Sequence, residues 1–370
     1  MGLAVNASIV DSYVTGLGNY TIHLTKELSR LEDDVLVYTS QPLMFPTQNL
    51  RLRSIATSFG PAHGKGAHIR RLLWTQWLLP IRLWRDAAKA LFCPIPEGPF
   101  VSPVPTVLVM HDLIPLRFSK DYPSQRLYFQ WYVKPLVRRA RKVIAVSEAT
   151  KADLVKFFRI DPARIHVIPC GCDHEVFYAG INPEKVKRKY RLRSYCLYVG
   201  NLHPHKNLGR LIQAFHRVAE DGRRQLVIVG KKDPRFYPAL QSLADQLGLG
   251  ETVVFLDYVP PGDLPGLYAG AEVFVHPSLH EGFGLPLVEA MACGVPVIAS
   301  RAGATETVVG KAGLIVDPTK PEEIADAIRT IFANKECRET LVSAGLDRAQ
   351  YYSWRSTAQM VARVIHECAR

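Results

Sequence analysis

Short apolar runs alternate with helical stretches along most of this 370-residue chain. The runs of the first half span residues 3–7, 35–39, 90–93, 106–111, 142–146 and 165–168, and those of the second half span 195–200, 225–230, 252–256, 273–276, 295–299 and 313–316. Apolar runs of this length read as buried strands. Strands that alternate with helices predict βαβ units and parallel sheets, so the chain is expected to have an α/β fold.

The series of predicted strands starts again near residue 195, after a polar and charged stretch at 182–193. The chain is also longer than a usual single domain, which favours two domains of about 180 residues each. We predict an N-terminal domain over residues 1–180, a C-terminal domain over 181–352 and a final helical segment over 353–370. Ligands of such parallel sheets bind at the carboxyl ends of the strands.

The most informative motif is the stretch EGFGLPLVE, which begins at Glu281 and ends at Glu289. It follows the predicted strand 273–276, and two glycines and Pro286 lead into an apolar helical pattern. The free amides at such a helix N-terminus bind anions. A carboxylate beside a phosphate repels it, so the two glutamates are expected to bind hydroxyl groups. A nucleotide sugar carries hydroxyls on both sides of its diphosphate.

This stretch resembles the E-x7-E signature of the retaining glycosyltransferases of family 4, the group 1 glycosyltransferases of GT-B fold. The resemblance runs from the N-terminal glycine loop to the last helix. It implies two Rossmann-like domains that face each other across a deep cleft, with the helix in 353–370 crossing back to the first domain. The alternative for the two glutamates alone is an ordinary solvated position in a turn and on a helix.

A second motif, GNLHPHKN, ends the first strand of the second domain. Lys206 leads into a helix there and is suited to hold a diphosphate as a point charge. The family commonly has an arginine where Asn201 stands, so one cation fewer faces the leaving group. His203, His205 and the amides after Gly282 are candidates to compensate. The alternative for Lys206 is a surface position.

The run GLGNY follows the first strand and opens a helix, and Gly16 and Gly18 allow a ligand to approach the backbone. A dinucleotide fold requires a third glycine at position 21, which is Thr21, and an acidic residue after the second strand. The NAD interpretation is therefore weak. The resemblance implies instead that this loop approaches the donor diphosphate and, with Asn19 and Tyr20, the acceptor.

His111 and Asp112 end the predicted strand 106–111. The resemblance implies that His111 lies near the reacting carbon, where it contacts the 6-hydroxyl of the donor sugar or shapes the acceptor pocket. The alternative is a structural histidine that Asp112 orients. Ser147 is predicted to cap the helix that starts at residue 148. It is also a candidate to touch the acceptor or a phosphate.

Together these motifs define the predicted site. We expect His111, Lys206 and Glu281 to be catalytic, and we expect the donor to contact Gly16, Gly18, Asn201, Lys206, Glu281, Gly282, Phe283, Gly284, Leu285 and Glu289. Asn19, Tyr20, Asp112 and Ser147 are expected on the acceptor side. The chain has no D-x-D sequence to anchor a bridging metal, so a metal-independent reaction without a cofactor is predicted.

The formal net charge of +12 is unevenly placed. Residues 51–142 carry sixteen Lys and Arg against four Asp and Glu. Within this region, residues 69–85 and 126–142 interleave basic residues with Trp, Tyr and Leu, as do helices that lie on anionic membranes. The alternatives are helices that cover the sheet with a basic outer face, and a nucleic-acid surface. We expect membrane contact and no nucleic acid.

The chain has no run of eighteen apolar residues, and its N-terminus reads as a first strand rather than a signal peptide. Seven cysteines, an odd number, suit a reducing compartment. Cys170 and Cys172 form a C-x-C pair, for which metal binding is the alternative, but they fit the P-x-G-x-D segment of the family and are expected to be structural thiols. A cytoplasmic protein, peripheral on the inner face of the membrane, is expected.

These expectations lead to one predicted function. The chain is expected to transfer a hexose, with UDP-glucose the favoured donor, to a glycan or a polyprenyl-diphosphate-linked acceptor in exopolysaccharide or lipopolysaccharide synthesis. A GDP-mannose-dependent α-mannosyltransferase is the first alternative. A nucleotide-sugar 2-epimerase requires further carboxylates and histidines near residues 90–120, where only His111 and Asp112 suit. A non-catalytic nucleotide-sugar-binding protein is the alternative from a different class.

Overall fold

The computed structural model describes residues 2–11, 16–45, 49–59, 64–219 and 224–369. The chain forms two compact units. Unit 1 comprises Met1–Gly171 and Trp354–Arg370, and unit 2 comprises Cys172–Ser353. The chain therefore passes between the units twice.

Unit 1 contains a seven-stranded parallel sheet in the order β3-β2-β1-β4-β5-β6-β7. The strands are β1 (Leu3–Asn6), β2 (Val35–Thr39), β3 (Leu50–Ser54), β4 (Ala90–Cys93), β5 (Thr106–Met110), β6 (Lys142–Ala145) and β7 (Ile165–Val167). β1, β2, β4 and β5 are buried along their whole length, as expected for strands that helices cover on both faces.

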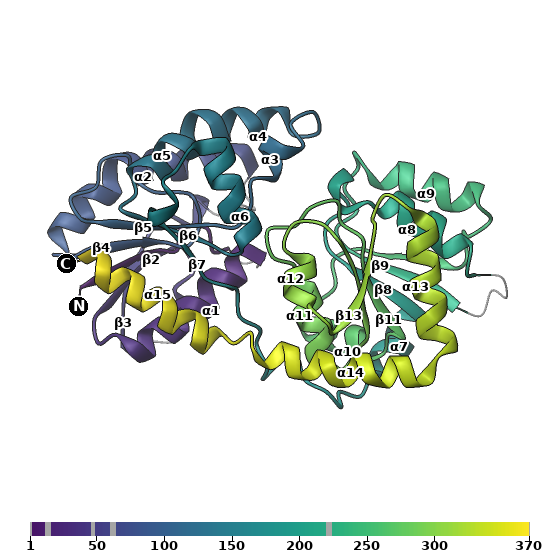
Figure 1. Ribbon diagram of the computed structural model, residues 1–370. Helices are drawn as coiled ribbons and strands as arrows, with labels where there is room; N and C mark the ends of the chain where they lie inside the picture. The colour runs from purple at the N-terminus through teal and green to yellow at the C-terminus, as the bar shows by residue number, and fades with distance from the viewer. Residues whose placement is uncertain (1, 12–15, 46–48, 60–63, 220–223, 370) are drawn as a thin grey trace. The chain divides into compact units, whose positions relative to one another are not determined.

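Two groups of helices cover this sheet (Figure 1). α1 (Gly16–Leu31) and α15 (Trp354–Ala369) pack side by side. The other group is α2 (Gly64–Arg85), α3 (Ile114–Arg117), α4 (Pro123–Tyr128), the π-helical turn η4 (Phe129–Val133), α5 (Lys134–Arg139) and α6 (Glu148–Asp153) with its continuation η5 (Leu154–Phe158). Trp74, Leu79 and Leu83 of α2 and Leu136 and Val137 of α5 join the core beneath this second group. Short helical turns complete the unit at η1 (Pro42–Met44), η2 (Thr57–Phe59) and η6 (Pro162–Arg164).

Unit 2 contains a six-stranded parallel sheet in the order β10-β9-β8-β11-β12-β13. The strands are β8 (Ser194–Val199), β9 (Arg224–Val229), β10 (Val253–Leu256), β11 (Val273–His276), β12 (Val297–Ser300) and β13 (Gly313–Val316). The helices are α7 (Glu184–Tyr190), η7 (Pro204–Lys206), α8 (Leu208–His216), α9 (Tyr237–Gln246), η8 (Pro261–Asp263), α10 (Leu264–Ala269), α11 (Leu285–Ala292), α12 (Thr305–Val309), α13 (Pro321–Ala333) and α14 (Lys335–Gln350). α8 and α13 pack together over one core, and α11 packs against α14.

The predicted α/β fold class is confirmed, because both units are Rossmann-like parallel sheets wound with helices. Each of the twelve predicted strands is present within two residues of its expected bounds. β3 was missed. It pairs only with β2 at the sheet edge, and Arg51 and Arg53 alternate with its leucines. An edge strand keeps polar side chains in solvent, so it lacks the continuous apolar run of a buried strand.

All seven cysteines are free thiols, and Cys170 and Cys172 are buried, which fits the expected structural role. Both lie at the first passage between the units. Within unit 2 the amide of Cys172 donates to the carbonyl of Tyr352 at 3.1 Å, and within unit 1 the Thr357 hydroxyl donates to the carbonyl of Pro169 at 2.9 Å. In each unit, therefore, the ends of the two connecting segments are hydrogen-bonded together. Within the described residues, no helix combines the length and the apolar character of a membrane span.

Candidate functional site

The turn that follows β11 in unit 2 holds Glu281 in a fixed backbone position. Gly303, the third residue of the loop between β12 and α12, has a positive φ of 64°, and a Cβ there would overlap with the backbone amide and carbonyl of Glu281. The amide of Ala304 donates to the Glu281 carbonyl at 3.1 Å. Only glycine fits this close approach, so position 303 is part of the site although no motif marked it.

One oxygen of the buried Glu281 carboxylate accepts hydrogen bonds from two side chains. Lys206 Nζ donates to Oε1 at 2.5 Å, and His276 Nε2 donates to the same oxygen at 2.9 Å. Lys206 ends η7 after β8, and His276 ends β11. The structure thus brings together the predicted Lys206 and Glu281, from neighbouring strands of the sheet.

Backbone and amide hydrogen bonds join the two loops that carry these side chains. Asn207 has a left-handed conformation, with φ 62°, and its Nδ2 donates to the carbonyls of Pro277 at 3.0 Å and Pro318 at 2.6 Å. The amide of Leu279 donates to the His205 carbonyl at 2.7 Å. Because the side chain of Asn207 is buried and fully used, it positions Lys206 without being free to bind a ligand itself.

Electrostatics keep Glu281 ionised. Burial by itself would raise its pKa, but the nearby Lys206 ammonium and the hydrogen bond from His276 outweigh burial and hold the pKa of Glu281 well below its usual range. Removing one member of a buried ion pair leaves the other unpaired, which costs about 3–5 kcal/mol. Each of the two side chains, Lys206 and Glu281, therefore needs an opposite charge beside it, which either the other side chain or a ligand supplies.

Sequence reasoning missed His276, which it treated only as the end of a strand. Its ring is buried and nearly parallel to those of Tyr198 and Phe274, at 6.1 and 5.9 Å. Nδ1 is buried and has no hydrogen-bond partner in the part of the chain that the structure describes. The proton therefore belongs on Nε2, where it points at Glu281. The one signal in the sequence that could have identified His276 is a polar residue at the carboxyl end of an apolar strand.

The glycine turn before α11 has the predicted form. Gly284 has φ 101°, occupies the N-cap position and offers no side chain to the first helical amides. α11 begins at Leu285, so Pro286 is its second residue. Phe283 packs its buried ring edge-on against Tyr352 at 5.5 Å, which leaves its backbone rather than its side chain for a ligand. Gly282 is buried in the same turn. Anion binding by these amides stays a prediction.

Glu289 is the fifth residue of α11, just over one turn inside the helix as expected. Its Oε2 accepts from the Tyr268 hydroxyl at 2.7 Å. Burial raises the pKa of Glu289 to about 7, and the bond from Tyr268 opposes that rise. Near neutral pH the group is therefore present both as a carboxylate and as a carboxylic acid, and it is able to accept or donate a hydrogen bond to a hydroxyl.

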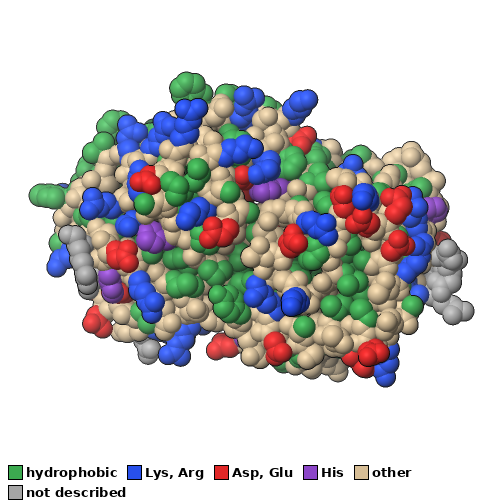
Figure 2. All heavy atoms as spheres, viewed as in Figure 1, with side chains coloured by type: hydrophobic (Ala, Val, Ile, Leu, Met, Phe, Trp, Pro, Cys, Tyr) green, Lys and Arg blue, Asp and Glu red, His purple; other side chains and the backbone are tan. Residues whose placement is uncertain are grey.

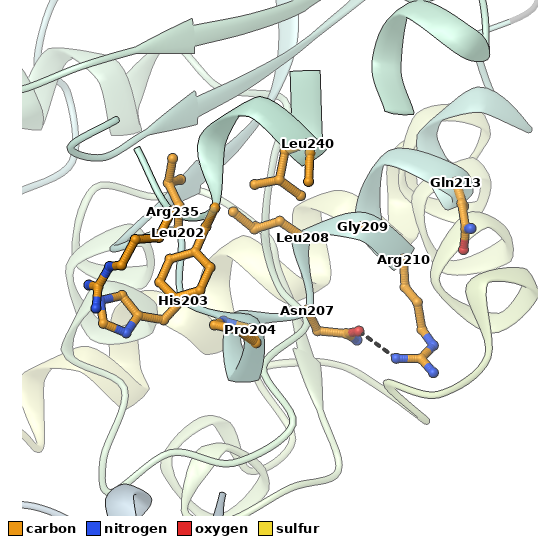
Figure 3. Close-up of a pocket in the computed structure, with 12 residues that line it drawn as sticks. Leu202, His203, Pro204, Asn207, Leu208, Gly209, Arg210, Gln213, Arg235 and Leu240 are labelled. Atoms are coloured by element: carbon orange, nitrogen blue, oxygen red, sulfur yellow. Dashed lines mark hydrogen bonds between the residues drawn. The ribbon is translucent and has the colours of Figure 1, made fainter. Parts of the chain in front are cut away.

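A cavity of 430 Å³ lies next to η7 (Figure 3). His203 and Arg235 lie side by side at one end of it, and Arg210 lies at the other, where its Nη1 donates to Asn207 Oδ1 at 2.9 Å. The Arg235 guanidinium lies 5.0 Å from the ring centre of Phe236. Two arginines therefore line the cavity beside the loop that carries Lys206, and Asp233 pairs with the Arg235 guanidinium at 2.6 Å.

The cation that is missing at Asn201 is not replaced by the neighbouring histidines. Burial lowers the pKa of His203, and it lowers the pKa of His205 to about 3, so both rings are neutral near pH 7. Asn201 itself is exposed, and its carbonyl accepts from the Tyr198 hydroxyl at 2.9 Å. Of the candidates considered from the sequence, only the amides after Gly282 remain. Arg235 lies nearby but pairs with Asp233 at 2.6 Å.

In unit 1, the structure brings Tyr20 and His111 together. The Tyr20 ring meets the His111 ring edge-on at 4.6 Å, and its buried hydroxyl has no hydrogen-bond partner within the described residues. His111 Nε2 donates to the Pro94 carbonyl at 2.9 Å. Burial lowers the pKa of His111 to about 4, so the imidazole is neutral near pH 7. A neutral ring that donates through Nε2 leaves Nδ1 as an acceptor for a hydroxyl.

The other predicted residues of unit 1 lie around the start of α1 and at two helix caps. Gly16 begins α1, and a Cβ there would meet no atom within 4 Å. Gly18 is buried and Asn19 is exposed. Asp112 Oδ1 accepts from the amide of Ile114 at 2.9 Å, before α3. Ser147 accepts from the amide of Thr150 at 3.1 Å and caps α6 as predicted.

No group of three or more His, Cys, Asp or Glu side chains among the described residues is arranged to hold a metal ion.

Comparison with known families assigns both halves of the chain. Residues 183–348 match the family model Glycosyl transferases group 1, and residues 14–176 match the model Glycosyltransferase Family 4. The chain carries the domains of a group 1 glycosyltransferase. This glycosyltransferase is 29% identical to O-antigen chain mannosyltransferase B of Escherichia coli, over 92% of this chain and 93% of that protein. It is 28% identical to O-antigen chain mannosyltransferase RfbU of Salmonella typhimurium, over 89% of this chain and 90% of that protein.

Solved structures show the same fold. The glycosyltransferase superposes on sucrose-phosphate synthase from Thermosynechococcus elongatus with a TM-score of 0.78 and 21% identity, over 99% of this chain and 98% of that one. It superposes on HepE from Anabaena, solved in complex with UDP and glucose, with a TM-score of 0.77 and 20% identity, over 99% and 100%. At these identities the likeness supports the GT-B fold, which both units match.

Proposed function

We propose that this glycosyltransferase moves a hexose from a nucleotide diphosphate sugar to a glycan or a polyprenyl-diphosphate-linked acceptor. The observation that carries the proposal is the partly buried contact between Lys206 and Glu281 beside the glycine turn that opens α11. The ammonium and the uncapped helical amides suit a diphosphate, and the carboxylate suits sugar hydroxyls. The names of the two full-length relatives support O-antigen or lipopolysaccharide assembly as the setting.

Lys206 has the central role in the proposed mechanism. An ammonium has three N–H donors, so Lys206 is able to keep its bond to Glu281 and still donate to the leaving diphosphate. Negative charge builds on that diphosphate as the sugar departs, and Lys206 and the first amides of α11 stabilise it. Losing a group of this kind typically raises the barrier by about 3–4 kcal/mol. Glu281 orients the sugar and Glu289 binds the ribose.

The transfer is proposed to retain the configuration of the sugar and to need no metal. The acceptor hydroxyl attacks on the face that the diphosphate leaves, and the departing phosphate takes its proton. Neutral His111 accepts a hydrogen bond from a sugar hydroxyl through Nδ1. Lys206 and the α11 amides supply the positive potential at the phosphate. Proton NMR of the anomeric signal in the first product tests retention.

Two donors follow from different observations. UDP-glucose is the donor that the sequence favoured. GDP-mannose is favoured by the names of two relatives, both mannosyltransferases, which this chain matches over nearly their whole length. A thermal-shift screen with UDP, GDP and ADP sugars, with and without Mg²⁺ or EDTA, separates them. A shift with one nucleotide family identifies the base, and transfer assays then identify the sugar. The proposal fails if none of the donors shifts the unfolding temperature.

One variant separates the enzyme from the two other classes considered. Glu281→Gln keeps the size of the side chain and removes its charge. If the protein transfers sugar, the variant binds the nucleotide but loses transfer. A protein that only senses the nucleotide sugar shows no transfer in either form. An epimerase converts the donor without any acceptor, which chromatography of the donor pool detects.

The proposed lipid-linked acceptor calls for contact with a membrane, and we propose a peripheral position on its cytoplasmic face. Residues 69–85 and 126–142 form most of α2 and the segment from α4 to α5. Each segment buries one side on the sheet, as the alternative interpretation required, while large apolar side chains stay exposed on the other. The buried sides fit the sheet-covering interpretation, and the exposed apolar side chains support the proposed membrane contact. No nucleic-acid partner is proposed.

A further inference from the structure

α2 is apolar on its outer side as well as on the side that packs on the sheet. Trp74, Leu79 and Leu83 are buried, whereas Trp77 is 72% exposed and Trp84 is 75% exposed. Ile69, Leu73, Trp77, Ile81 and Trp84 are all exposed and, at spacings of three or four residues, lie along one side of the helix. Soluble monomers rarely expose a continuous apolar surface of this kind without a partner for it.

Hydrogen bonds from Gln76 join this helix to two other segments of unit 1. Gln76 Nε2 donates to the carbonyl of Gly98 at 2.8 Å and to the hydroxyl of Tyr132 at 3.0 Å. Its Oε1 accepts from the amide of Phe100 at 2.9 Å, and the rings of Phe100 and Tyr132 lie 5.1 Å apart. α2, the loop after β4 and η4 therefore meet at one point.

Gln76, Phe100 and Tyr132, which meet at this point, each have a large exposed apolar residue next to them in the sequence. Trp77 follows Gln76, Val101 follows Phe100 at 81% exposure, and Trp131 precedes Tyr132 at 77% exposure. We call Trp77, Val101 and Trp131, with the exposed apolar row of α2, the tryptophan surface. In Figure 2, hydrophobic side chains stand out from the upper and left edges of unit 1 with Lys and Arg side chains beside them.

A cavity of 700 Å³ adjoins this surface. The loop over residues 99–106 and α5 with the residues after it form its walls, and Arg139 and Arg141 line it together with Phe100 and Val101. The Arg139 guanidinium lies 5.5 Å from the ring centre of Phe100. Because Val101 belongs both to the cavity and to the tryptophan surface, the two arginines lie at the border of the exposed apolar residues.

The cavity is separate from the predicted substrate residues of unit 1. Thr106, the first residue of β5, lines the cavity, whereas His111 follows the last residue of the same strand. A strand rises about 3.3 Å per residue, which puts His111 about 16 Å from Thr106. A molecule bound at the cavity therefore leaves the site near His111 open.

We infer that an anionic phospholipid binds here: its phosphate lies between Arg139 and Arg141 in the cavity, while Trp77, Val101 and Trp131 enter the interfacial layer of the bilayer. This inference rests on the membrane contact proposed above and assigns its residues. Guanidinium groups pair well with phosphate, and tryptophan favours the membrane interface. Residues 51–142 contain sixteen basic and four acidic residues, and this positive charge complements an anionic bilayer.

Sedimentation with vesicles tests the inference on the full chain without any donor. We expect binding to vesicles of phosphatidylcholine with phosphatidylglycerol and weak binding to phosphatidylcholine alone. The double variant Arg139→Gln/Arg141→Gln is expected to bind the anionic vesicles about tenfold or more weakly, at roughly a few-fold per basic residue. Trp77→Ala/Trp131→Ala is expected to lose at least about tenfold, because two interfacial side chains are removed.

The matched control removes two exposed charges from the same unit. Arg355 and Arg363 lie on α15, in the other group of helices, and Arg355→Gln/Arg363→Gln is expected to bind vesicles within about twofold of wild type. Equal loss in the control and in Arg139→Gln/Arg141→Gln overturns the inference, because net charge then explains binding. Unchanged binding of the tryptophan variant also overturns it, and so does the lack of tryptophan quenching by brominated lipid acyl chains. Circular dichroism checks folding, and UDP and GDP binding tests the proposed transferase site separately.

Discussion

The loops around Lys206 in unit 2 and the tryptophan surface in unit 1 depart from the usual distribution of side chains in opposite ways. In unit 2, a partly buried ammonium meets a buried carboxylate and a buried imidazole at the ends of two strands. In unit 1, tryptophans are exposed on the outside of a helix whose other side is packed. Buried charges require partners, and exposed apolar surface requires a cover. In unit 2 the charged and polar groups are partners of one another, whereas the exposed side chains of unit 1 have the membrane only as a proposed cover.

The largest expected effect compares two tryptophans of one helix. Trp74 is buried against Tyr38 and Phe59, and Trp84 is exposed. Trp74→Ala is expected to lower the free energy of unfolding by about 3–5 kcal/mol, because it leaves a cavity in the core. Trp84→Ala is expected to change it by less than about 0.5 kcal/mol. Urea denaturation of both variants measures the difference, and a similar loss in both would mean that α2 packs its outer side against protein.

The second prediction concerns Lys206, the partly buried cation of unit 2. Lys206→Met keeps the length of the side chain and removes the charge that faces the diphosphate. The rate of transfer at saturating donor is expected to fall about a hundred- to a thousandfold. Single-turnover assays measure this rate. Lys189→Met, on α7, is the matched control, since that lysine pairs with Asp263 near the surface and should leave the rate unchanged. A rate near wild type for Lys206→Met would remove it from the mechanism.

The third prediction separates positioning from packing at His276. His276→Gln retains an N–H group that is able to reach Glu281, whereas His276→Leu does not. A hydrogen bond to a charged group contributes about 1.5–3 kcal/mol, so His276→Leu is expected to lower kcat/KM by roughly ten- to a hundredfold. Rescue by His276→Gln to within a few-fold of wild type supports the positioning role. Equal losses in the two variants would point to ring packing between Tyr198 and Phe274 instead.

The last prediction concerns the pH dependence of Glu289. Its pKa is about 7 in the folded protein, above the ordinary value of 4.5. The folded state therefore favours the protonated group, and this contribution to stability is present below about pH 4.5 and is lost as the pH rises through 7. The free energy of unfolding is expected to fall by at most about 1.4 kcal/mol per pH unit, because one proton is involved. Denaturation of wild type and Glu289→Gln between pH 4.5 and 8 is expected to show the loss in wild type alone; parallel curves would contradict it.

Predictions from sequence succeeded where a local pattern carries the physical cause. The apolar runs marked twelve strands because a buried parallel strand must be apolar on both faces. The glycine turn before α11 was also correctly predicted, since Gly284 adopts a conformation that other residues disfavour. The predictions missed β3, whose Arg51 and Arg53 face solvent at the sheet edge, and His276, which looked like any strand end.

By itself, the sequence determined the α/β class, the strand series and the residue types that suit a nucleotide sugar. Only the tertiary structure decided which of those residues act together. It joined Lys206 to Glu281 across 75 residues of chain, added His276 and Gly303, and showed that His205 is too deeply buried to carry a charge near pH 7. The physical reason is that a backbone pattern depends on neighbouring residues, whereas burial and pairing of charge depend on which strand ends the fold brings side by side.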